Sequence, residues 1–517
     1  MNLSFMSRPS VKISKLNETW LKVQCQETWQ ELDIQDRFSF IVPNAKHDPR
    51  VKKGHWDGVK RLFNRRDKKM YLGLLLQLLS FCEEKGWDVD LDPRLLPTDE
   101  TINKSDILHL CNELIKPHSN GNPIVPHDYQ LDAVEYMMNM DRTICLSATS
   151  SGKSLMIYLA ARMYQLMDEF DDKNIFIIVP SISLVEQLYS DFQDYSTFDG
   201  MQWHVNAHVQ KVSGKYEKYI NKQIVITTWQ SLKNMPYDVY ETIGAVFCDE
   251  AHGVKADVLT SILESLTQCN IRHGLTGTLD DVECNELVIQ GLLGPKKVIV
   301  TAKEIMDSGA AAQIKVNMVV LNHNQATINA YRQHIYKYPF DQKYLGEIEY
   351  LYANEERSNL ILDLIESLEG NTLVLFDRVE KYGEPLYQKF LERRPDTTFL
   401  ITGDVEGSER EAIRTGVEDQ DNCTVFASFG TLSVGVSIKR LHNMVVISSS
   451  KSKIRVLQSI GRMMRKHFTK DIGNVFDIVD DLTVGTDKPN YSMQHAAKKL
   501  EFYTKEQFDV EFIKLDL

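Results

Sequence analysis

The sequence predicts an α/β protein with two doubly wound parallel-sheet domains in tandem, preceded by a small α+β module. Three observations predict this fold. Short apolar runs alternate with helical stretches from residue 144 to about residue 303, and the same alternation restarts at residue 373. Continuous apolar strands separated by helices are typical of parallel sheets that are covered on both faces. A chain of 517 residues is also too long for a single hydrophobic core.

Composition shifts along the chain divide it into four segments. Pro117 to Pro126 is rich in residues that break helices and strands, and it marks the first boundary. A less regular stretch, with tyrosine-rich helices between Ala330 and Tyr352, separates the two alternating regions. We expect an α+β module at 1–116, a first sheet domain at 117–310, a second at 311–485 and a helical extension at 486–517.

The expected strands are short runs of apolar and β-branched residues. In the N-terminal module they lie near Lys12 to Cys25 and Phe38 to Val42. In the first sheet domain they lie at 143–146, 175–179, 224–227, 245–248 and 272–275. In the second they lie at 373–376, 398–401, 424–427, 444–447 and 475–478.

Composition indicates a globular protein of a reducing compartment. Hydrophobic residues make up 43% of the chain and charged residues 25%. The eight cysteines include no C-x-x-C pair, which argues against a zinc site and a disulfide framework. The longest apolar run, near Leu72 to Phe81, is too short to span a bilayer, and the N-terminus lacks a signal-peptide pattern. We expect a cytoplasmic protein with no membrane partner.

A phosphate-binding loop is predicted at Ser147–Ser154, SATSSGKS, between an apolar strand and an apolar helix. Backbone N–H groups of such a loop hold phosphate, Lys153 reaches the β- and γ-phosphates, and Ser154 offers a hydroxyl to Mg²⁺. The alternative is a turn of small residues before a buried helix, since Ser147 stands where the first glycine of the motif would be. The expected nucleotide-binding residues are Ser147, Ala148, Thr149, Ser150, Ser151, Gly152, Lys153 and Ser154.

Two adjacent carboxylates follow the strand expected at 245–248, in the sequence DEAH from Asp249 to His252. Ligands of parallel sheets bind at the carboxyl ends of the strands. Asp249 is therefore predicted to hold the Mg²⁺ shell, and Glu250 to orient and deprotonate the water that attacks the γ-phosphate. The alternative, an acidic surface turn, does not account for the preceding strand and the phosphate loop upstream.

The strongest basic cluster of the chain lies between Arg50 and Lys69, although the net charge is −13. Its sequence KKGHWDGVKRLF predicts a tight turn at Gly54 and Gly58 that carries Trp56. A basic turn with an exposed aromatic suits a phosphate backbone, whereas the alternative is a solvated face with Trp56 as a core anchor. The residues expected to contact DNA here are Lys52, Lys53, Lys60, Arg61, Arg65 and Arg66.

The ordered motifs resemble those of superfamily-two helicases. The similar segments are PHDYQ ending at Gln130, the loop, DEAH, IVPSISLVEQ at 178–187, TTWQSL at 227–232, LTGTL at 275–279 with Thr276 and Thr278, LVLFDR at 373–378, SFGTLSVGVSI at 428–438 and QSIGRMMRK at 458–466. The resemblance implies RecA-like domains, ATP as the nucleotide, and adenine recognition by Gln130. It further implies nucleic-acid contacts by Pro180, Thr228 and Thr431. Coupling of hydrolysis to strand movement is implied for His252, Thr276, Thr278 and Gly435.

The last of these motifs, Q-x-x-G-R-x-x-R, has a physical reason. Gln458, Gly461, Arg462 and Arg465 are expected to open a helix of the second domain, so that both guanidinium groups reach a nucleotide held by the first. Planar, always-charged arginine suits the charge that develops on the γ-phosphoryl oxygens. Hydrolysis would then require domain closure, as in a motor. Taken alone, the two arginines would more often be a solvated helix face. Because the motifs from Gln130 to Arg465 are complete without residues 1–116, removal of that segment is expected to leave a folded ATPase.

Within the superfamily the chain resembles the UvsW family, the recombination helicases of T-even bacteriophages. The shared features are the G-x-W-D-G turn at Gly54–Gly58, the T-S-x-G-K-S form of the loop, KSKI at Lys451–Ile454 and G-R-x-x-R-K-H at Gly461–His467. This resemblance implies remodelling of branched DNA: fork regression, branch migration and R-loop unwinding in phage recombination and repair. The implied partners are single-stranded, forked, four-way-junction and R-loop DNA, with single-strand-binding and recombination proteins, in the host cytoplasm.

Two other function classes stay open from the residues. A duplex translocase of a restriction or remodelling system shares every motif named above. A non-motor protein that uses ATP as a switch for DNA binding could dispense with Glu250, Arg462 and Arg465, which are all present.

Overall fold

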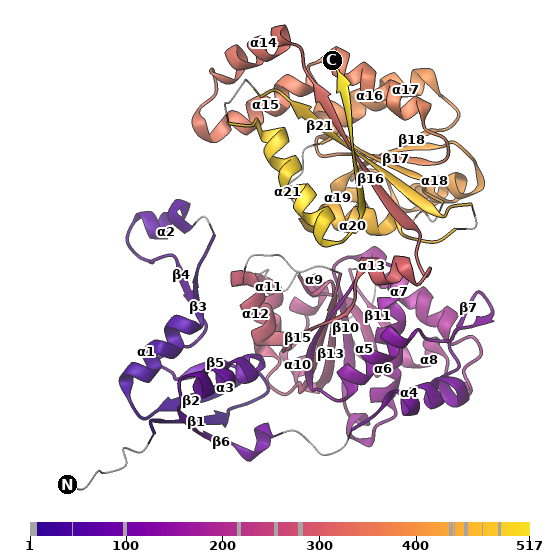
Figure 1. Cartoon of the computed structure of the whole chain (residues 1–517). Helices are drawn as coiled ribbons and strands as arrows, with labels where there is room; N and C mark the ends of the chain where they lie inside the picture. Colours follow the sequence, from indigo (N-terminus) through magenta and orange to yellow (C-terminus); the bar gives the residue numbers. More distant parts are fainter. Residues whose placement is uncertain are drawn as a thin grey trace. The chain divides into compact units, whose positions relative to one another are not determined.

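The computed structural model describes residues 8–43, 45–96, 101–214, 219–252, 257–277, 283–433, 438, 440–448, 453–467, 469–483 and 488–517. Two seven-stranded parallel sheets and a small N-terminal module confirm the predicted fold class (Figure 1). The chain divides into two compact units. Residues 1–147 and 152–299 form one unit, and residues 148–151 and 300–517 form the other.

A four-stranded sheet with the order β5-β2-β1-β6 forms the N-terminal module. β1 (Ser10–Lys15) is antiparallel to β2 (Trp20–Cys25) and parallel to β6 (Asp88–Leu91), while β5 (Lys69–Tyr71) is antiparallel to β2. Alternate side chains of a strand share one face, and Val11, Ile13, Leu21 and Val23 are fully buried on theirs. Helices α1 (Thr28–Arg37) and α3 (Leu75–Glu84) contribute buried Ile34 and Leu78 to the same core.

A two-stranded ribbon extends from this module. β3 (Ser39–Ile41) pairs antiparallel with β4 (Val59–Arg61), and the short helix α2 (Pro49–Lys52) lies at its far end (Figure 1). The predicted tight turn is confirmed, since Gly54 and Gly58 have φ values of 71° and 78°. A β-carbon at Gly58 would also lie 2.9 Å from the Ala45 Cβ, so that this position requires glycine.

The first large sheet has the strand order β11-β12-β10-β13-β14-β9-β15. Its strands are β9 (Arg142–Ser147), β10 (Asn174–Val179), β11 (Val209–Val212), β12 (Ile224–Thr228), β13 (Ile243–Asp249), β14 (Ile271–Thr276) and β15 (Lys296–Val300). The main helices between them are α5 (Asp128–Met138), α6 (Lys153–Gln165), α7 (Ile182–Tyr195), α9 (Trp229–Lys233), α10 (Tyr237–Thr242), α11 (Asp257–Ser265) and α12 (Glu283–Leu293). Because helices cover both faces, β10, β12 and β13 are buried along almost their whole length.

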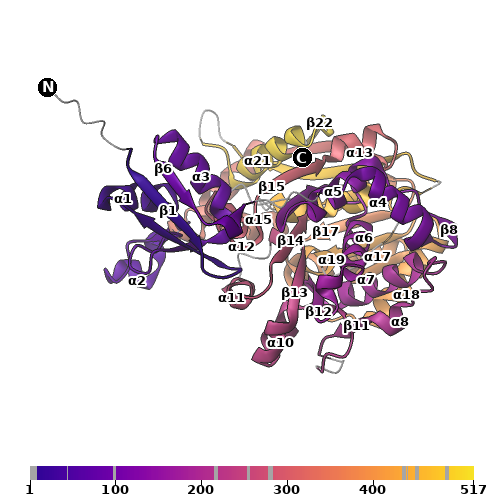
Figure 2. The same cartoon turned by 90° about the horizontal axis from the view of Figure 1, so that it is seen from below.

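The module and this sheet domain share one hydrophobic core. Tyr71 packs against Gly291 of α12, where a β-carbon would lie 2.6 Å from its ring, and its hydroxyl donates to Glu264 Oε1 at 2.5 Å. Gln77 of α3 donates to Gln290 of α12, and both figures place these helices side by side (Figure 2). The module is therefore a fixed part of the first unit.

The second large sheet has the order β18-β19-β17-β20-β21-β16-β22, and its described strand pairs are parallel. Its strands are β16 (Gln313–Asn322), β17 (Thr372–Phe376), β18 (Thr398–Ile401), β19 (Thr424–Ser428), β20 (Asn443–Val446), β21 (Ile472–Asp481) and β22 (Asp509–Asp516). The helices include α13 (Ala302–Asp307), α14 (Gln325–Ile335), α15 (Lys343–Tyr352), α16 (Glu355–Ser367), α17 (Glu384–Arg393), α18 (Gly407–Asp419), α19 (Phe429–Ser433), α20 (Lys453–Met463) and α21 (Tyr491–Lys505).

The expected helical extension at the C-terminus is wrong in one respect. After α21 the chain forms β22, which pairs with β16 along its whole length and completes the edge of the second sheet. Its exposed side chains alternate with partly buried ones, as expected for an edge strand. Across the part of the chain that the structure describes, no helix is both long enough and apolar enough to cross a membrane.

Candidate nucleotide and nucleic-acid site

The predicted phosphate loop leaves the end of β9 and enters α6 at Lys153. Ser150 and Gly152 adopt positive φ values of 69° and 79°, which turns the backbone back on itself. A β-carbon at Gly152 would lie 2.4 Å from Gln130 Nε2, so only glycine fits between the loop and that amide. The helix that follows is 13 residues long, and its first N–H groups have no partner within the helix. The local geometry is that of an anion-binding helix start.

Lys153 and Ser154 are partly exposed at this helix start. Lys153 Nζ lies 3.4 Å from the Ser147 carbonyl, so the side chain folds back along the loop. The Ser154 hydroxyl shares a hydrogen bond of 3.3 Å with the Tyr195 hydroxyl of α7. Both polar groups therefore lie in the first turn of α6, next to the loop.

Gln130 lies in the first turn of α5 and is buried. Its Oε1 accepts a hydrogen bond from the His127 backbone N–H at 2.9 Å, which fixes the plane of the amide. Its Nε2 then faces Gly152, as the close approach to that residue shows. A predicted adenine-reading residue and the phosphate loop are thus adjacent in space.

Asp249 ends β13, and Lys153 is near enough to oppose the rise in its pKa. Burial and the neighbouring Glu250 carboxylate raise the pKa of Asp249. Its Oδ1 is buried and makes no hydrogen bond to any part of the chain that is described. An unsatisfied buried carboxylate oxygen beside the loop fits a Mg²⁺ ligand, because a divalent cation would remove the desolvation cost.

Glu250, His252 and Thr276 form a small polar cluster at the ends of β13 and β14. His252 Nδ1 lies 3.3 Å from Glu250 Oε2 and 3.1 Å from Thr276 Oγ1. Thr276 Oγ1 donates to Glu250 Oε2 at 3.5 Å. Glu250 has a φ of 54°, a conformation that is rare outside glycine and is common at functional sites. Two of the predicted coupling residues therefore contact the predicted base directly. The other two, Thr278 and Gly435, lie outside the described residues.

Pro180 and Thr228, the two predicted nucleic-acid contacts of the first domain, line one cavity of about 380 Å³. The N-termini of α7 and α9 open into it, each capped by a hydroxyl: Ser181 accepts from Leu184 N–H, and Thr228 accepts from Ser231 N–H. Four of the other lining residues belong to the predicted motifs at 178–187 and 227–232, whereas Gly214 and Asn234 lie outside both motifs and were not predicted. The remaining lining residues are Ser181, Ile182, Gly214, Gln230, Ser231 and Asn234.

In the second sheet Ser428 occupies the place of Thr228 at the end of its strand, and Thr431 occupies the place of Ser231. Its hydroxyl and that of Ser428 lie 2.7 Å apart, and the Thr431 N–H donates to Ser428 Oγ. In the first domain the Thr228 and Ser231 hydroxyls are paired in the same way at 3.1 Å. Both pairs follow the second strand of their sheet, β12 or β19. The predicted contact is therefore part of a structural repeat between the two domains.

The Q-x-x-G-R-x-x-R motif does not open a helix as predicted. α20 begins at Lys453, so Gln458 lies in its middle, Arg462 in its last turn and Arg465 beyond its end. Buried Ile460 and Met463 within the motif continue a helical spacing that begins at buried Val456, upstream of the motif. The motif thus occupies the C-terminal end of the helix and the turn that follows.

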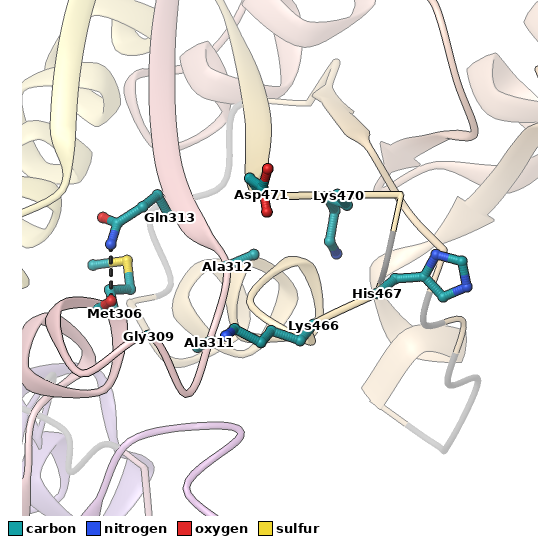
Figure 3. A pocket seen from close by; sticks show the side chains of 9 residues that line it. All are labelled: Met306, Gly309, Ala311, Ala312, Gln313, Lys466, His467, Lys470 and Asp471. Atoms are coloured by element: carbon teal, nitrogen blue, oxygen red, sulfur yellow. Dashed lines mark hydrogen bonds between the residues drawn. The ribbon is translucent and has the colours of Figure 1, made fainter.

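A cavity of about 490 Å³ lies directly after this motif and was not predicted (Figure 3). Lys466, His467 and Lys470 line it together with Gln313 at the start of β16. Lys470 is buried and donates to the Met463 carbonyl at 2.8 Å, and burial together with Arg465 lowers its pKa to about 8. The residues after Arg465 therefore carry several cations in one place.

The basic cluster of the module lies on the β3–β4 ribbon and the loop after it. Carboxylates pair with part of it: Arg61 with Asp57 at 2.5 Å, and Arg65 with Glu31 at 3.8 Å. Lys52, Lys53, Lys60 and Arg66 have no carboxylate partner among the described residues. Trp56 is neither exposed nor a core anchor. It is half-buried beneath Arg50, whose guanidinium lies 4.8 Å from the ring, and its Nε1 donates to the Val59 carbonyl.

Comparison with known proteins decides the family. The family described as "DNA helicase UvsW, N-terminal" matches residues 11–92, and "Type III restriction enzyme, res subunit" matches residues 123–281. The ATP-dependent DNA helicase uvsW of Enterobacteria phage T4 is 30% identical over 517 residues, covering 96% of this chain and 98% of the relative. The chain belongs to the UvsW family of DNA helicases.

Structural comparisons agree with membership in the UvsW family. The crystal structure of T4 UvsW matches with a TM-score of 0.51 and 27% identity, over 98% of this chain and 99% of that chain. A DNA-bound type ISP restriction-modification enzyme, LlaBIII, shares the fold alone, with a TM-score of 0.52 and 14% identity over 77% of this chain and 32% of its own. Probable helicase D10 of Escherichia phage T5 is 24% identical over 49% of this chain and 52% of the relative. Like its UvsW relatives, this protein is an ATP-dependent DNA helicase of superfamily two.

Proposed function

We propose that this helicase remodels branched DNA, by fork regression, branch migration and R-loop unwinding, in the recombination and repair of a phage genome in the host cytoplasm. The observation that carries the proposal is the match of residues 11–92 to the UvsW N-terminal family, together with 30% identity over nearly the whole chain. The motor motifs are common to many helicases, whereas this module separates the UvsW family from them. Single-strand-binding and recombination proteins are proposed as partners on the same substrates.

In this proposal ATP binds the loop with Gln130 at its adenine. Ser154 and Asp249 hold Mg²⁺, which neutralises phosphate charge when it is bound. Lys153 contacts the β- and γ-phosphates, and Glu250 takes the proton of the attacking water. His252 and Thr276, which contact Glu250, report the state of the γ-phosphate to the end of β14.

The arginines of the second domain complete the reaction only when the two domains close. Arg462 and Arg465 would then stabilise negative charge on the γ-phosphoryl oxygens, and Gln458 would position the nucleotide. Pro180 and Thr228 in the first domain and Thr431 in the second would contact the backbone of the tracked strand. The unpaired cations Lys52, Lys53, Lys60 and Arg66 would hold a duplex arm, because phosphate contacts position a protein without reading sequence.

ATP hydrolysis measured on matched single-stranded, duplex, forked, four-way-junction and R-loop substrates tests this function. Forked or branched DNA is expected to stimulate turnover most, with gel analysis showing regressed or migrated products. Glu250→Gln serves as the control for background hydrolysis. Equal stimulation by linear duplex and forked DNA, without rearranged products, would reject the proposal.

A duplex translocase is the second candidate, because the restriction-enzyme family matches residues 123–281. A translocase would displace a third strand from duplex DNA without separating the duplex. Triplex displacement without fork processing would therefore favour it.

A further inference from the structure

Two aromatic rings stand out at the turn between α14 and α15. Tyr336 is 89% exposed and Phe340 is 86% exposed, the two highest values for large hydrophobic side chains in the described part of the chain. Exposure of one such ring is common, but two rings within five residues need a reason because they cost hydration free energy. We define Tyr336–Phe340 as the aromatic tip. None of the residues assigned to ATP or to strand contacts lies in it.

The aromatic tip is held rigidly although its rings are exposed. Between them, the Tyr338 hydroxyl donates to Glu349 Oε2 at 2.6 Å, and its ring lies 5.1 Å from that of His334. The Tyr338 ring packs closely against Gly346 of α15, where a β-carbon would lie 2.7 Å from the ring. Pro339 fixes one φ angle of the turn. Tyr338 therefore anchors the turn, and the exposed Tyr336 and Phe340 lie on either side of it in the sequence.

The two helices beneath the tip are also fixed to the second domain. Tyr331 donates to Glu347 Oε2 at 2.7 Å, and Tyr350 donates to the Thr327 carbonyl at 2.8 Å, which joins α14 to α15. Glu347 is fully buried and also accepts hydrogen bonds from the Tyr491 and Ser492 N–H groups of α21. The tip is therefore carried by helices that are hydrogen-bonded to each other and to α21, and not by a loose loop.

Residues 336–343 carry two lysines and one aspartate, in a chain whose net charge is −13. Lys337 lies between the two rings in sequence and Lys343 follows them, and neither lysine has a carboxylate partner among the residues that the structure describes. Asp341 is the nearest acidic residue in sequence. Exposed rings with adjacent cations form the combination that binds unpaired nucleotides, because each base stacks on a ring while a cation contacts its phosphate.

We propose that the aromatic tip stacks on unpaired bases of a DNA strand. A protein partner fits less well, because a stable protein interface buries about 800 Å² on each side with an apolar centre. Here two rings stand among polar neighbours, including Lys337, Asp341 and Gln342. An unpaired base needs only one ring face and one cation. The inference rests on the proposed function, in which unpaired DNA forms at a fork.

Binding of the full-length protein to a fork with a fluorescent 2-aminopurine in its single-stranded arm tests the tip. Tyr336→Ala and Phe340→Ala should each weaken binding about 5- to 100-fold and restore the fluorescence that stacking quenches. Tyr336→Phe and Phe340→Tyr should keep wild-type affinity, because they keep the ring. Phe512→Ala is the matched control, since Phe512 is also exposed, at 54%, on β22 of the same unit. Unchanged melting temperatures confirm folding.

A second arm of the experiment separates stacking from phosphate contact. On a fork whose single-stranded arm carries abasic sites, wild type should lose the affinity that the bases provide, and the alanine variants should bind like wild type. Equal affinity of wild type and both alanine variants on the intact fork would overturn the inference, and so would an equal loss on intact and abasic arms. If wild type itself neither hydrolyses ATP on forks nor rearranges them, the proposed function fails instead.

Discussion

Arg272 Nη2 donates a hydrogen bond to Thr19 Oγ1 at 2.8 Å, although 253 residues separate the two in sequence. Both residues are buried, at 0% and 1% exposure, where the module meets β14. Nearby, Arg142 of β9 donates to the Glu18 carbonyl. The module is therefore bonded to the strand that ends in Thr276. This contact changes the expectation that residues 1–116 can be removed, since their loss would expose the shared core.

Thr19→Val is expected to lower the free energy of unfolding of the first unit by about 1 to 3 kcal/mol, because it leaves a buried guanidinium N–H without its acceptor. Thr19→Ser keeps the acceptor and should stay close to wild type. Chemical denaturation of the full chain measures both. If valine and serine variants were equally stable, the hydrogen bond would contribute nothing. Deleting residues 1–116 should give an aggregating or unfolded protein.

The unpaired cations of the ribbon can be tested without deleting the module. Lys52, Lys53, Lys60 and Arg66 replaced together by Gln should leave the fold and basal ATPase unchanged, since none of the four is buried. Fork affinity should fall, and the slope of log affinity against log salt should flatten by about 0.9 for each DNA phosphate that the variant no longer neutralises. Lys85→Gln is the control, because Lys85 is paired with Asp33 at 2.7 Å. If the slope of log affinity against log salt were unchanged in the variant, the four cations would not contact DNA phosphates and would only be a solvated face.

Lys153→Ala and Glu250→Gln should both lower the rate of DNA-stimulated ATP hydrolysis about 10² to 10⁴-fold. The two variants should differ in nucleotide binding. Lys153 is the proposed phosphate contact, so its loss should weaken ATP affinity as well. Glu250 is proposed to act on water, so the Gln variant should still bind ATP. Steady-state turnover and a fluorescent-nucleotide titration measure the two effects. Near-normal turnover of the Gln variant would move the general base to another residue.

Arg465→Ala should lower turnover by about 10³-fold or more and change ATP affinity only a few-fold. Arg465→Lys should restore little, because an ammonium group cannot reproduce the planar fork of arginine. Single-turnover hydrolysis at saturating DNA is the measurement. Full activity of either variant would assign the role to Arg462.

The pH dependence of stability should contain a contribution from His273. Burial lowers the pKa of His273 to about 3, and its ring nitrogens contact the Thr143 and Tyr164 hydroxyls, both at 2.8 Å. The unfolded chain binds the proton near pH 6.5 and the folded chain does not, so stability falls as the pH drops below 6.5. Between pH 8 and pH 5, wild type should lose about 2 kcal/mol more than His273→Gln. Parallel stability curves for the two proteins would contradict this.

Most central strands were predictable from sequence, whereas β18 was the one edge strand of the two large sheets that was predicted, at 398–401. β10, β12, β13 and β14 are continuous apolar runs because helices bury both of their faces. β15 and β22 are mostly exposed, so their mixed residues carry no such signal. β16 is mostly buried but begins within the stretch whose sequence lacks a regular alternation.

The phosphate loop and DEAH were recognisable because their chemistry requires fixed residue types at fixed spacing. The contact between Arg272 and Thr19 could not be predicted, because the two residues are far apart in the sequence and only tertiary packing brings them together. The start of α20 was predicted several residues after its true position, because the Q-x-x-G-R-x-x-R pattern does not include the helical residues before Gln458. The aromatic tip was predictable only as part of a tyrosine-rich stretch, since sequence does not distinguish anchoring Tyr338 from exposed Tyr336.

The paired hydroxyls Thr228–Ser231 and Ser428–Thr431 have a consequence for directionality. Each pair stands at the end of the second strand of its sheet, with the same spacing of three residues. A backbone phosphate that passes from one pair to the other would meet the same donors, so the two holding states would be close in free energy. A transfer between equal states has no preferred direction. The direction of movement would then have to come from the order in which ATP binds and phosphate leaves, and not from the two hydroxyl pairs.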